Sequence, residues 1–163
     1  GKVIDLLKSE VDKRLIQVKA DLRINLPITK QLSYHLNLYG GITIGENLPE
    51  YYQYRLGGIF EQNIINFKNF SGFYFAQLNT NNVVLVSNDL QFKFYKNLFL
   101  SGNFSFANLS DDISFEDAVK VNYSSVGATL GYKSPFGQIK LNFSHSLKNN
   151  QKGIFSVILG HWF

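Results

Sequence analysis

The 163-residue sequence contains neither cysteine nor methionine, and only three prolines. Without cysteine the chain forms no disulfide, holds no thiolate metal site and has no thiol nucleophile. Long apolar runs are missing too: no unbroken hydrophobic stretch is longer than residues 83–86, whereas a membrane-spanning helix needs about 20 such residues. Charge is scarce, at 17% of residues with a net charge of +4, and no lysine- or arginine-rich run occurs. We therefore expect neither a membrane-spanning helix nor a nucleic-acid partner.

Aromatic residues are abundant, at 15% of the chain, and 15 of them are phenylalanine. The chain is long enough for one domain of ordinary size. Many aromatics together with few charges and few prolines favour a β-rich protein over a helical one.

Apolar and polar residues alternate strictly over residues 16–26, where every even position is apolar and every odd position is polar or charged. This period of two predicts a strand with one buried or lipid-facing side. The same period recurs in six later segments, which we also interpret as strands: residues 32–44, 84–94, 98–106, 126–133, 138–147 and 153–163. Residues 1–13 fit a helical spacing as well as a strand, so this lead-in is left as a loop, a helix or a partial strand.

The predicted strands are about 10–14 residues long, whereas strands of soluble sandwiches average about 5–6. A tilted strand of about 9–11 residues crosses a bilayer. The connections alternate between tight turns and long loops, which is typical of outer-membrane barrels. We therefore predict an all-β fold, an antiparallel transmembrane β-barrel with about 7–8 strands in this chain, over residues 14–163. A soluble β fold is the alternative.

The polar face of these strands is expected to face the barrel interior. This face includes Lys19, Asp21, Arg23, Asp89, Gln91 and Lys93, and Lys133 and Lys140 lie on the same face of later strands. We interpret them as a solvated or self-paired interior rather than as a selectivity or transport site. Seven strands is an odd count, whereas bacterial single-chain barrels have an even number of at least eight. Either one strand is missed and the barrel is small, or the chain is the C-terminal part of a larger barrel.

Four segments, in this order, resemble the BamA-type barrels of the bacterial surface antigen superfamily. The first, LPEYYQYRLGG, resembles the segment leading into that family's large inward-folded loop, and SNDLQFKF resembles the strand after it. GYKSPFGQIKLNFSHSL resembles the penultimate hairpin and FSVILGHWF the closing strand. The resemblance covers roughly residues 14–163. It implies the last seven strands of a sixteen-stranded barrel, an inward-folding loop at about residues 45–82, and a C-terminal assembly signal at Gly160, Trp162 and Phe163.

The family's loop motif is altered in this sequence. The resemblance places it at Gly57 and Gly58 and at a tip formed by Ser71, Gly72 and Phe73, where the family carries an arginine in place of Ser71. The acidic partners of that arginine align with Gln91 and Ala107, so all three charges are replaced. Loss of the arginine together with both acidic partners is expected on physical grounds, because a buried charge left without its partner costs several kcal/mol. The branch fused to patatin-like phospholipases is the one this implies.

No catalytic constellation is found. The G-x-S-x-G elbow is absent, and the closest match, residues 127–131, has threonine in the serine position and lies within a predicted strand. Adjacent strand residues face opposite sides, so His145 shares no face with Ser144 or Ser146. The acidic pairs at residues 111–112 and 116–117 fit no calcium loop. We expect no catalytic residue, no cofactor and no metal in this chain.

Three functions stay open from the sequence. The chain is a translocator or anchor domain of a patatin-like phospholipase, an outer-membrane assembly or translocation factor, or a stand-alone eight-stranded barrel with a structural or lipid-modifying role. The expected location is the outer membrane of a Gram-negative bacterium. The expected partners are membrane lipid, the outer-membrane insertion machinery, and either upstream strands of the same protein or a second copy. Because the chain begins Gly-Lys-Val-Ile without a signal peptide, we expect it to be processed or to be a piece of a longer protein.

Overall fold

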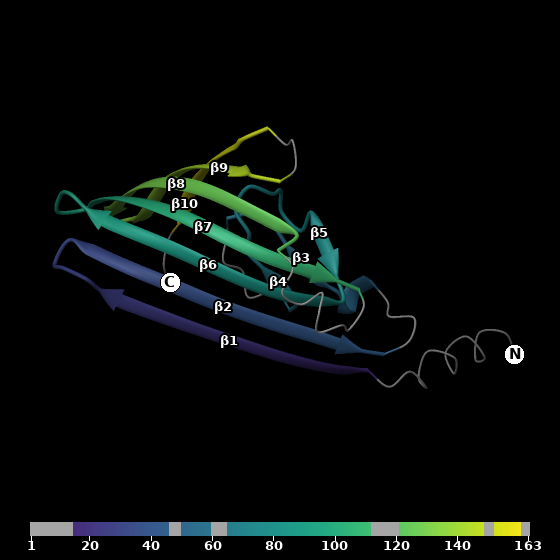
Figure 1. Cartoon of the computed structure of the whole chain (residues 1–163). Helices are drawn as coiled ribbons and strands as arrows, with labels where there is room; N and C mark the ends of the chain where they lie inside the picture. The colour runs from purple at the N-terminus through teal and green to yellow at the C-terminus, as the bar shows by residue number, and fades with distance from the viewer. Residues whose placement is uncertain (1–14, 46–49, 60–64, 112–120, 149–151, 161–163) are drawn as a thin grey trace, which may run out of the picture.

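The computed structural model describes residues 15–45, 50–59, 65–111, 121–148 and 152–160. Seven long strands form one antiparallel sheet in the order β1-β2-β6-β7-β8-β9-β10 (Figure 1). Their bounds are Ile16–Pro27 (β1), Leu32–Ile44 (β2), Asn82–Lys93 (β6), Leu98–Ser110 (β7), Tyr123–Ser134 (β8), Gly137–Ser146 (β9) and Ile154–Gly160 (β10). The all-β class and the seven antiparallel strands are thereby confirmed. The lead-in expected at residues 1–13 lies outside the described residues.

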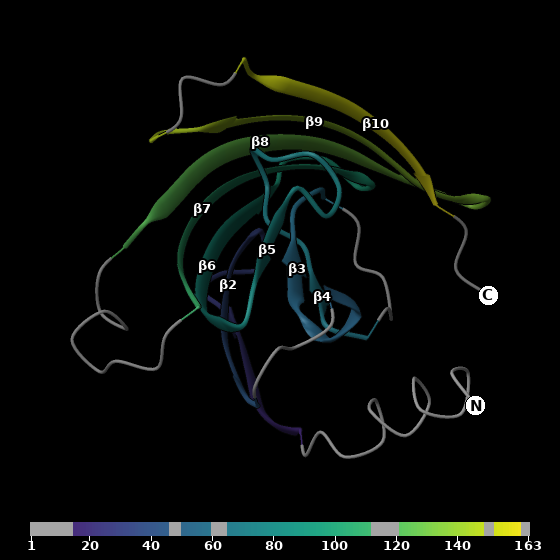
Figure 2. The ribbon, with the colours of Figure 1, turned by 90° about the vertical axis from the view of Figure 1, so that its right-hand side faces the viewer.

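The sheet is strongly curved but does not close on itself (Figure 2). Within the described residues, β1 pairs with β2 alone and β10 pairs with β9 alone. Two sheet edges therefore lack a neighbouring strand in the described part of the chain. Among the described residues, no helix combines the length and the hydropathy that crossing a membrane would take.

Register separates the two faces of the sheet by polarity. Leu22 of β1 lies opposite Leu38 of β2, which lies opposite Val86 of β6, and all three side chains lie on the convex face. Large apolar side chains are exposed along this face, including Leu22 at 53% and Phe155 at 66%. An apolar face turned outward and a largely polar face turned inward is the pattern of strands in an outer-membrane barrel.

The segment between β2 and β6 is folded rather than irregular. It contains a short 3₁₀ helix (η1, Glu50–Tyr52) and three short strands, β3 (Tyr54–Leu56), β4 (Phe67–Lys68) and β5 (Leu78–Thr80). These strands form a small sheet in the order β4-β3-β5, in which β3 and β4 run parallel. Figure 2 shows this loop within the curve of the large sheet, on its concave side.

A hydrophobic core fills the space between the loop and the sheet. The loop contributes Tyr54, Leu56, Phe70 and Phe73, and the sheet contributes Tyr39, Val83, Leu85 and Ala107. Burying one such large apolar side chain is worth about 1.5–3 kcal/mol. The concave face is therefore apolar where the loop packs and largely polar elsewhere, and the loop belongs to the folded core of the molecule.

Candidate functional site

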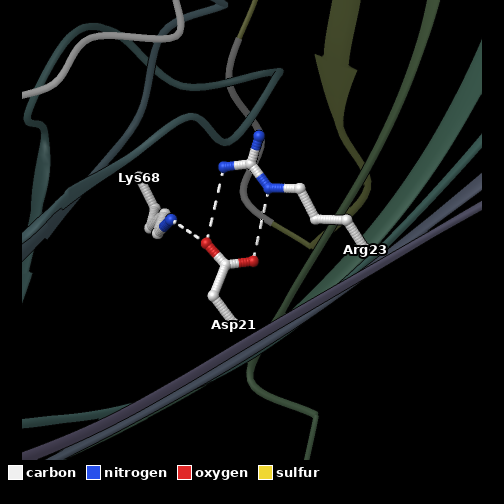
Figure 3. A network of polar contacts seen from close by, with 3 residues as sticks. All are labelled: Asp21, Arg23 and Lys68. Carbon is white, nitrogen blue, oxygen red and sulfur yellow. Dashed lines mark hydrogen bonds and ion pairs between the residues drawn. The ribbon is translucent and has the colours of Figure 1, made fainter.

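The base of the loop is joined to β1 by an ionic contact (Figure 3). The Lys68 Nζ of β4 lies 2.6 Å from a carboxylate oxygen of Asp21, and the Arg23 Nε lies 3.4 Å from the other oxygen. The side chains of Lys68 and Asp21 are 19% and 32% exposed. Sequence reasoning placed Asp21 and Arg23 on the inner face but missed Lys68, because only the folded loop brings it to β1. We call Asp21, Arg23 and Lys68 the β1 latch.

Further polar contacts hold the loop base beside the latch. Lys19 of β1 donates to the amide oxygen of Asn66, and Asn66 Nδ2 donates to the carbonyl of Tyr52 at 2.8 Å. Lys68 also lies over the ring of Tyr39, 4.4 Å from its centroid. A cation over an aromatic face adds attraction to the ion pair. The base of the loop is thus fixed to β1 and β2 by several independent contacts.

Tyr54 of β3 is buried and reaches across to β1. Its hydroxyl donates to the carbonyl of Val18 at 3.5 Å. Burial raises the pKa of the Tyr54 phenol above its ordinary value of 10.0. The hydroxyl therefore stays protonated at physiological pH and acts as a neutral donor.

The tip of the loop rests against strands on the other side of the sheet. Asn103 Nδ2 of β7 donates to the Ser71 hydroxyl at 3.1 Å, and Ser125 Oγ of β8 lies 3.4 Å from the same hydroxyl. Of the two positions that the resemblance aligns with the family's acidic partners, Gln91 lies on β6 and Ala107 of β7 packs in the core with Phe70 and Phe73. The Ser71 hydroxyl makes its hydrogen bonds with Asn103 and Ser125.

The glycines of the loop motif lie where backbones approach closely. Gly72 has a φ of +83°, and a Cβ there would lie 2.8 Å from the His145 carbonyl carbon of β9. Gly57 has a φ of +135°, and a Cβ there would lie 2.0 Å from the carbonyl oxygen of Tyr74. Gly58 has a φ of +72°. Positive φ is costly for residues with a side chain, so these three positions favour glycine.

Phe73 completes the tip with apolar contacts. Its ring stacks on Phe70 with centroids 5.1 Å apart and meets the edge of Tyr123 at 5.7 Å. Phe70 and Phe73 are each only 1% exposed, and both pack in the core with Ala107. Neutral hydrogen bonds and aromatic packing therefore hold the tip. Of the contributing side chains, Asn103 and Ser125 were not singled out from the sequence.

The other residues predicted from the sequence to face the interior or to form the assembly signal lie nearer the short turns or at the end of the sheet. Asp89 lies opposite His35 and Asn103, Gln91 lies opposite Ser33 and Ser101, and Lys93 lies opposite Phe99, all on the concave face. Gly160 is the last residue of β10, opposite Gln138. Trp162 and Phe163 of the expected assembly signal lie outside the described residues.

The serines on either side of His145 lie on the opposite face of the sheet from its side chain. His145 lies opposite Val126 on the convex face, whereas Ser144 and Ser146 are buried on the concave face at 1% exposure each. A nucleophile and its base must lie within about 3 Å of one another, and these residues point to opposite sides. Within the described part of the chain, no three His, Asp or Glu side chains gather closely enough to hold a metal ion.

Comparison with known proteins places this arrangement in a family. No curated protein matches the chain. Residues 7–163 match the family model described as the OMP85 superfamily. This confirms at the superfamily level the relationship expected from the loop and closing-strand motifs. The chain belongs to the OMP85 superfamily, and its barrel domain implies an outer-membrane β-barrel role in a diderm bacterium.

Proposed function

We propose that this chain is the C-terminal half of a larger barrel of about sixteen strands, which serves as the translocator or anchor of a patatin-like phospholipase. The catalytic domain lies outside this chain. Among the described residues the outer edges of β1 and β10 have no partner strand, which supports the larger barrel. In hydrocarbon each unpaired backbone group costs several kcal/mol, so an edge strand needs a partner strand. Upstream strands of the same protein or a second copy supply it.

The docked loop is the observation that carries the proposal. It spans the concave face from the β1 latch to Ser71 at β7 and β8, with a hydrophobic core beneath it. An eight-stranded ring has an interior just wide enough for side chains. A three-stranded loop with its own packed aromatics needs a wider ring. This argues against the stand-alone eight-stranded barrel and for a barrel whose interior is occupied by its own loop.

The neutral tip supports the patatin-fused branch. Ser71 stands where the resemblance implies an arginine, and its contacts are the neutral side chains of Asn103 and Ser125. A barrel used as an anchor or as the exit for one attached domain needs a stable loop position more than a charged, releasable one. The second candidate is an outer-membrane assembly or translocation factor. This chain keeps the glycines of the family's loop motif, and that observation favours this candidate.

The test uses the complete protein, purified from outer membranes and assayed for phospholipid hydrolysis. We expect turnover that depends on a serine nucleophile upstream of this chain and is unchanged by His145→Ala. Turnover lost with His145→Ala would overturn the proposal in favour of a lipid-modifying barrel. A complete protein without hydrolytic activity, carrying only small repeated domains upstream, would favour the assembly factor instead.

A further inference from the structure

A histidine on the concave face of β2 is hydrogen-bonded through both nitrogens of its ring. The Ser33 hydroxyl lies 3.1 Å from His35 Nε2, and the amide oxygen of Asn25 lies 2.6 Å from His35 Nδ1. Ser33 and His35 are two residues apart on one strand, so their side chains leave the same face of the sheet. Asn25 lies opposite His35 on β1. We call Ser33, His35 and Asn25 the β2 triad.

The tight turn between β1 and β2 brings Asn25 to His35. Inside this turn the Thr29 hydroxyl accepts hydrogen bonds from the backbone N–H groups of Gln31 and Leu32, at 3.2 and 3.0 Å. The turn of a hairpin fixes the register of its two strands. No catalytic residue was expected from the sequence, because Asn25 and His35 are ten positions apart and meet only through this pairing.

The two hydrogen bonds determine which ring nitrogen carries the proton. An amide oxygen only accepts hydrogen bonds, so the contact with Asn25 requires a proton on His35 Nδ1. In the neutral ring, Nε2 then has a free lone pair, and the Ser33 hydroxyl donates to it. A serine, a histidine that accepts its proton and a third group that orients the histidine are the parts of a nucleophilic acyl-transfer site.

The neighbours of the β2 triad on β6 supply a negative charge and amide donors. Asp89 lies opposite His35, and its carboxylate is attracted by both His35 and Lys140. A carboxylate at this position stabilises the imidazolium that forms when His35 takes the serine proton. Gln91 lies opposite Ser33 on the same face. Its amide N–H groups are the donors available to the oxyanion that develops on an ester carbonyl attacked by Ser33.

We propose that the β2 triad hydrolyses small, water-soluble esters inside the barrel, with Ser33 as nucleophile, His35 as general base and acid, and Asn25 as the residue that positions His35. The triad lies on the concave face near the short-turn end of the sheet, at the left of Figure 1. A phospholipid in the bilayer contacts the opposite face, whereas a dissolved ester enters the polar interior. The loop occupies part of that interior, so the ester is small (Figure 2).

The reaction uses only the three side chains, an ester and water. Ser33 Oγ forms a bond with the carbonyl carbon of the ester while its proton passes to His35 Nε2. The bond from that carbon to the leaving oxygen breaks, and Nε2 gives the proton to the departing alcohol. Water then attacks the acyl group on Ser33 and gives a proton to His35, which returns it to Ser33 Oγ as the acid leaves.

The first measurement is covalent labelling of the complete protein in phosphatidylcholine nanodiscs by a fluorophosphonate, with mass spectrometry of the peptides. The reagent reacts with an activated serine, whose oxygen displaces fluoride from phosphorus. We expect label on Ser33 that is lost in His35→Ala and retained in His145→Ala, the matched histidine on the convex face. Absence of label on Ser33 in the folded wild-type protein overturns the proposal, and this result needs no substituted chain.

The second measurement is hydrolysis of p-nitrophenyl acetate by the same preparation, with any upstream serine nucleophile replaced by alanine. Ser33→Ala and His35→Ala should each lower kcat/KM by about a hundredfold or more. Ser87→Ala, on the concave face of β6, should leave it unchanged. Asn25→Leu should lower kcat with KM unchanged, and Asn25→Asp, which keeps an accepting oxygen, should restore turnover. Hydrolysis that survives Ser33→Ala, or equal losses in the two Asn25 variants, would make the proposal wrong.

Heat-modifiable migration on gels shows that the barrel of each variant is folded. The β2 triad depends on the barrel but not on the phospholipase. An error in the phospholipase proposal therefore removes phospholipid hydrolysis and leaves the label on Ser33 in place. An error in the β2 triad removes the label and leaves phospholipid hydrolysis. The two failures are thus distinguishable in one preparation.

Discussion

Gly72 lies where the backbone of the loop tip meets the backbone of β9. A side chain at this position would clash with backbone atoms. The nearest atoms are the carbonyl group of His145 and the amide nitrogen of Ser146, which cannot move aside as the end of a flexible side chain can. Its φ of +83° adds a second penalty. The identity of this residue is therefore set by contact between two elements far apart in sequence.

We predict that Gly72→Ala destabilises the barrel by about 2 kcal/mol, since the left-handed conformation alone costs about 1–2 kcal/mol for an L-residue. The measurement is the urea midpoint for loss of the heat-modifiable band in detergent. Gly102→Ala is the matched control, because a Cβ at Gly102 on the convex face would have no atom within 4 Å. Equal shifts in the two variants would contradict the docked tip.

A second prediction concerns the lipid-facing side of β1. Leu22→Arg should cost about 2–4 kcal/mol, because a charge near the bilayer midplane on the lipid face loses its hydration. Asn25→Arg, on the concave face of the same strand, should cost about 1 kcal/mol for the lost Asn25–His35 hydrogen bond. Folding yield into vesicles and urea titration measure both. Similar costs at the two positions would count against the membrane assignment.

The sequence was sufficient to place single residues on a face but not to give their partners. Asp21 and Lys93 follow from strict alternation, since side-chain direction in a strand has a period of two. Ser71 could be located by its neighbours Gly72 and Phe73. Its contacts Asn103 and Ser125 could not, because they depend on how far the sheet curves. Nothing in the local sequence around Lys68 marks it as the partner of Asp21.

At the level of elements, the long strands were predictable and the loop strands were not. The strands β1 and β2 show their alternation over more than ten residues, which exceeds what a helix or a loop produces by chance. By contrast, β4 contains two residues and β3 and β5 contain three each. Strands this short carry no readable period, and their pairing depends on the aromatic core beneath them. Tertiary contacts therefore decide the fold of the loop.

We predict that the β1 latch contributes about 1 kcal/mol of coupling between the loop and the sheet, at the upper end for a partly exposed pair. The test is a double-mutant cycle with Asp21→Asn and Lys68→Gln, read as the rate of limited proteolysis within the loop in detergent. Each single variant should accelerate cleavage, the double variant should add little more, and high salt should reduce the difference. Arg55→Gln, on the exposed side of β3, is the control.

An additive effect in that cycle would show that Asp21 and Lys68 act independently. The ion pair between them would then contribute nothing to holding the loop on the sheet. The tip contacts should be far less sensitive to salt, because Phe70 and Phe73 are buried and uncharged. The two attachments of the loop thus differ in the condition that weakens them.

For the whole molecule, the open edges lead to a prediction about assembly. This chain expressed alone should not give a heat-modifiable monomer, because β1 and β10 each have one partner strand in the described part of the chain and would expose their other edge to lipid. The complete protein should give one. The measurement is gel migration with and without boiling, after refolding into detergent or vesicles. A folded monomer of this chain alone, with cysteines in β1 and β10 forming a disulfide, would make the small closed barrel correct.

The path of the loop also sets an order of events during assembly. The loop is connected to β2 and β6, which are neighbours in the sheet, yet its tip rests on β7, β8 and β9. The surface that receives Ser71 and Gly72 therefore exists only after three strands C-terminal to the loop have paired. Until then the aromatic rings of Phe70 and Phe73 lack the strands they pack against, and the concave face of the growing sheet is not covered by the loop tip. Docking of the tip is thus a late event, and protection of the loop from protease measures how nearly complete this part of the barrel is.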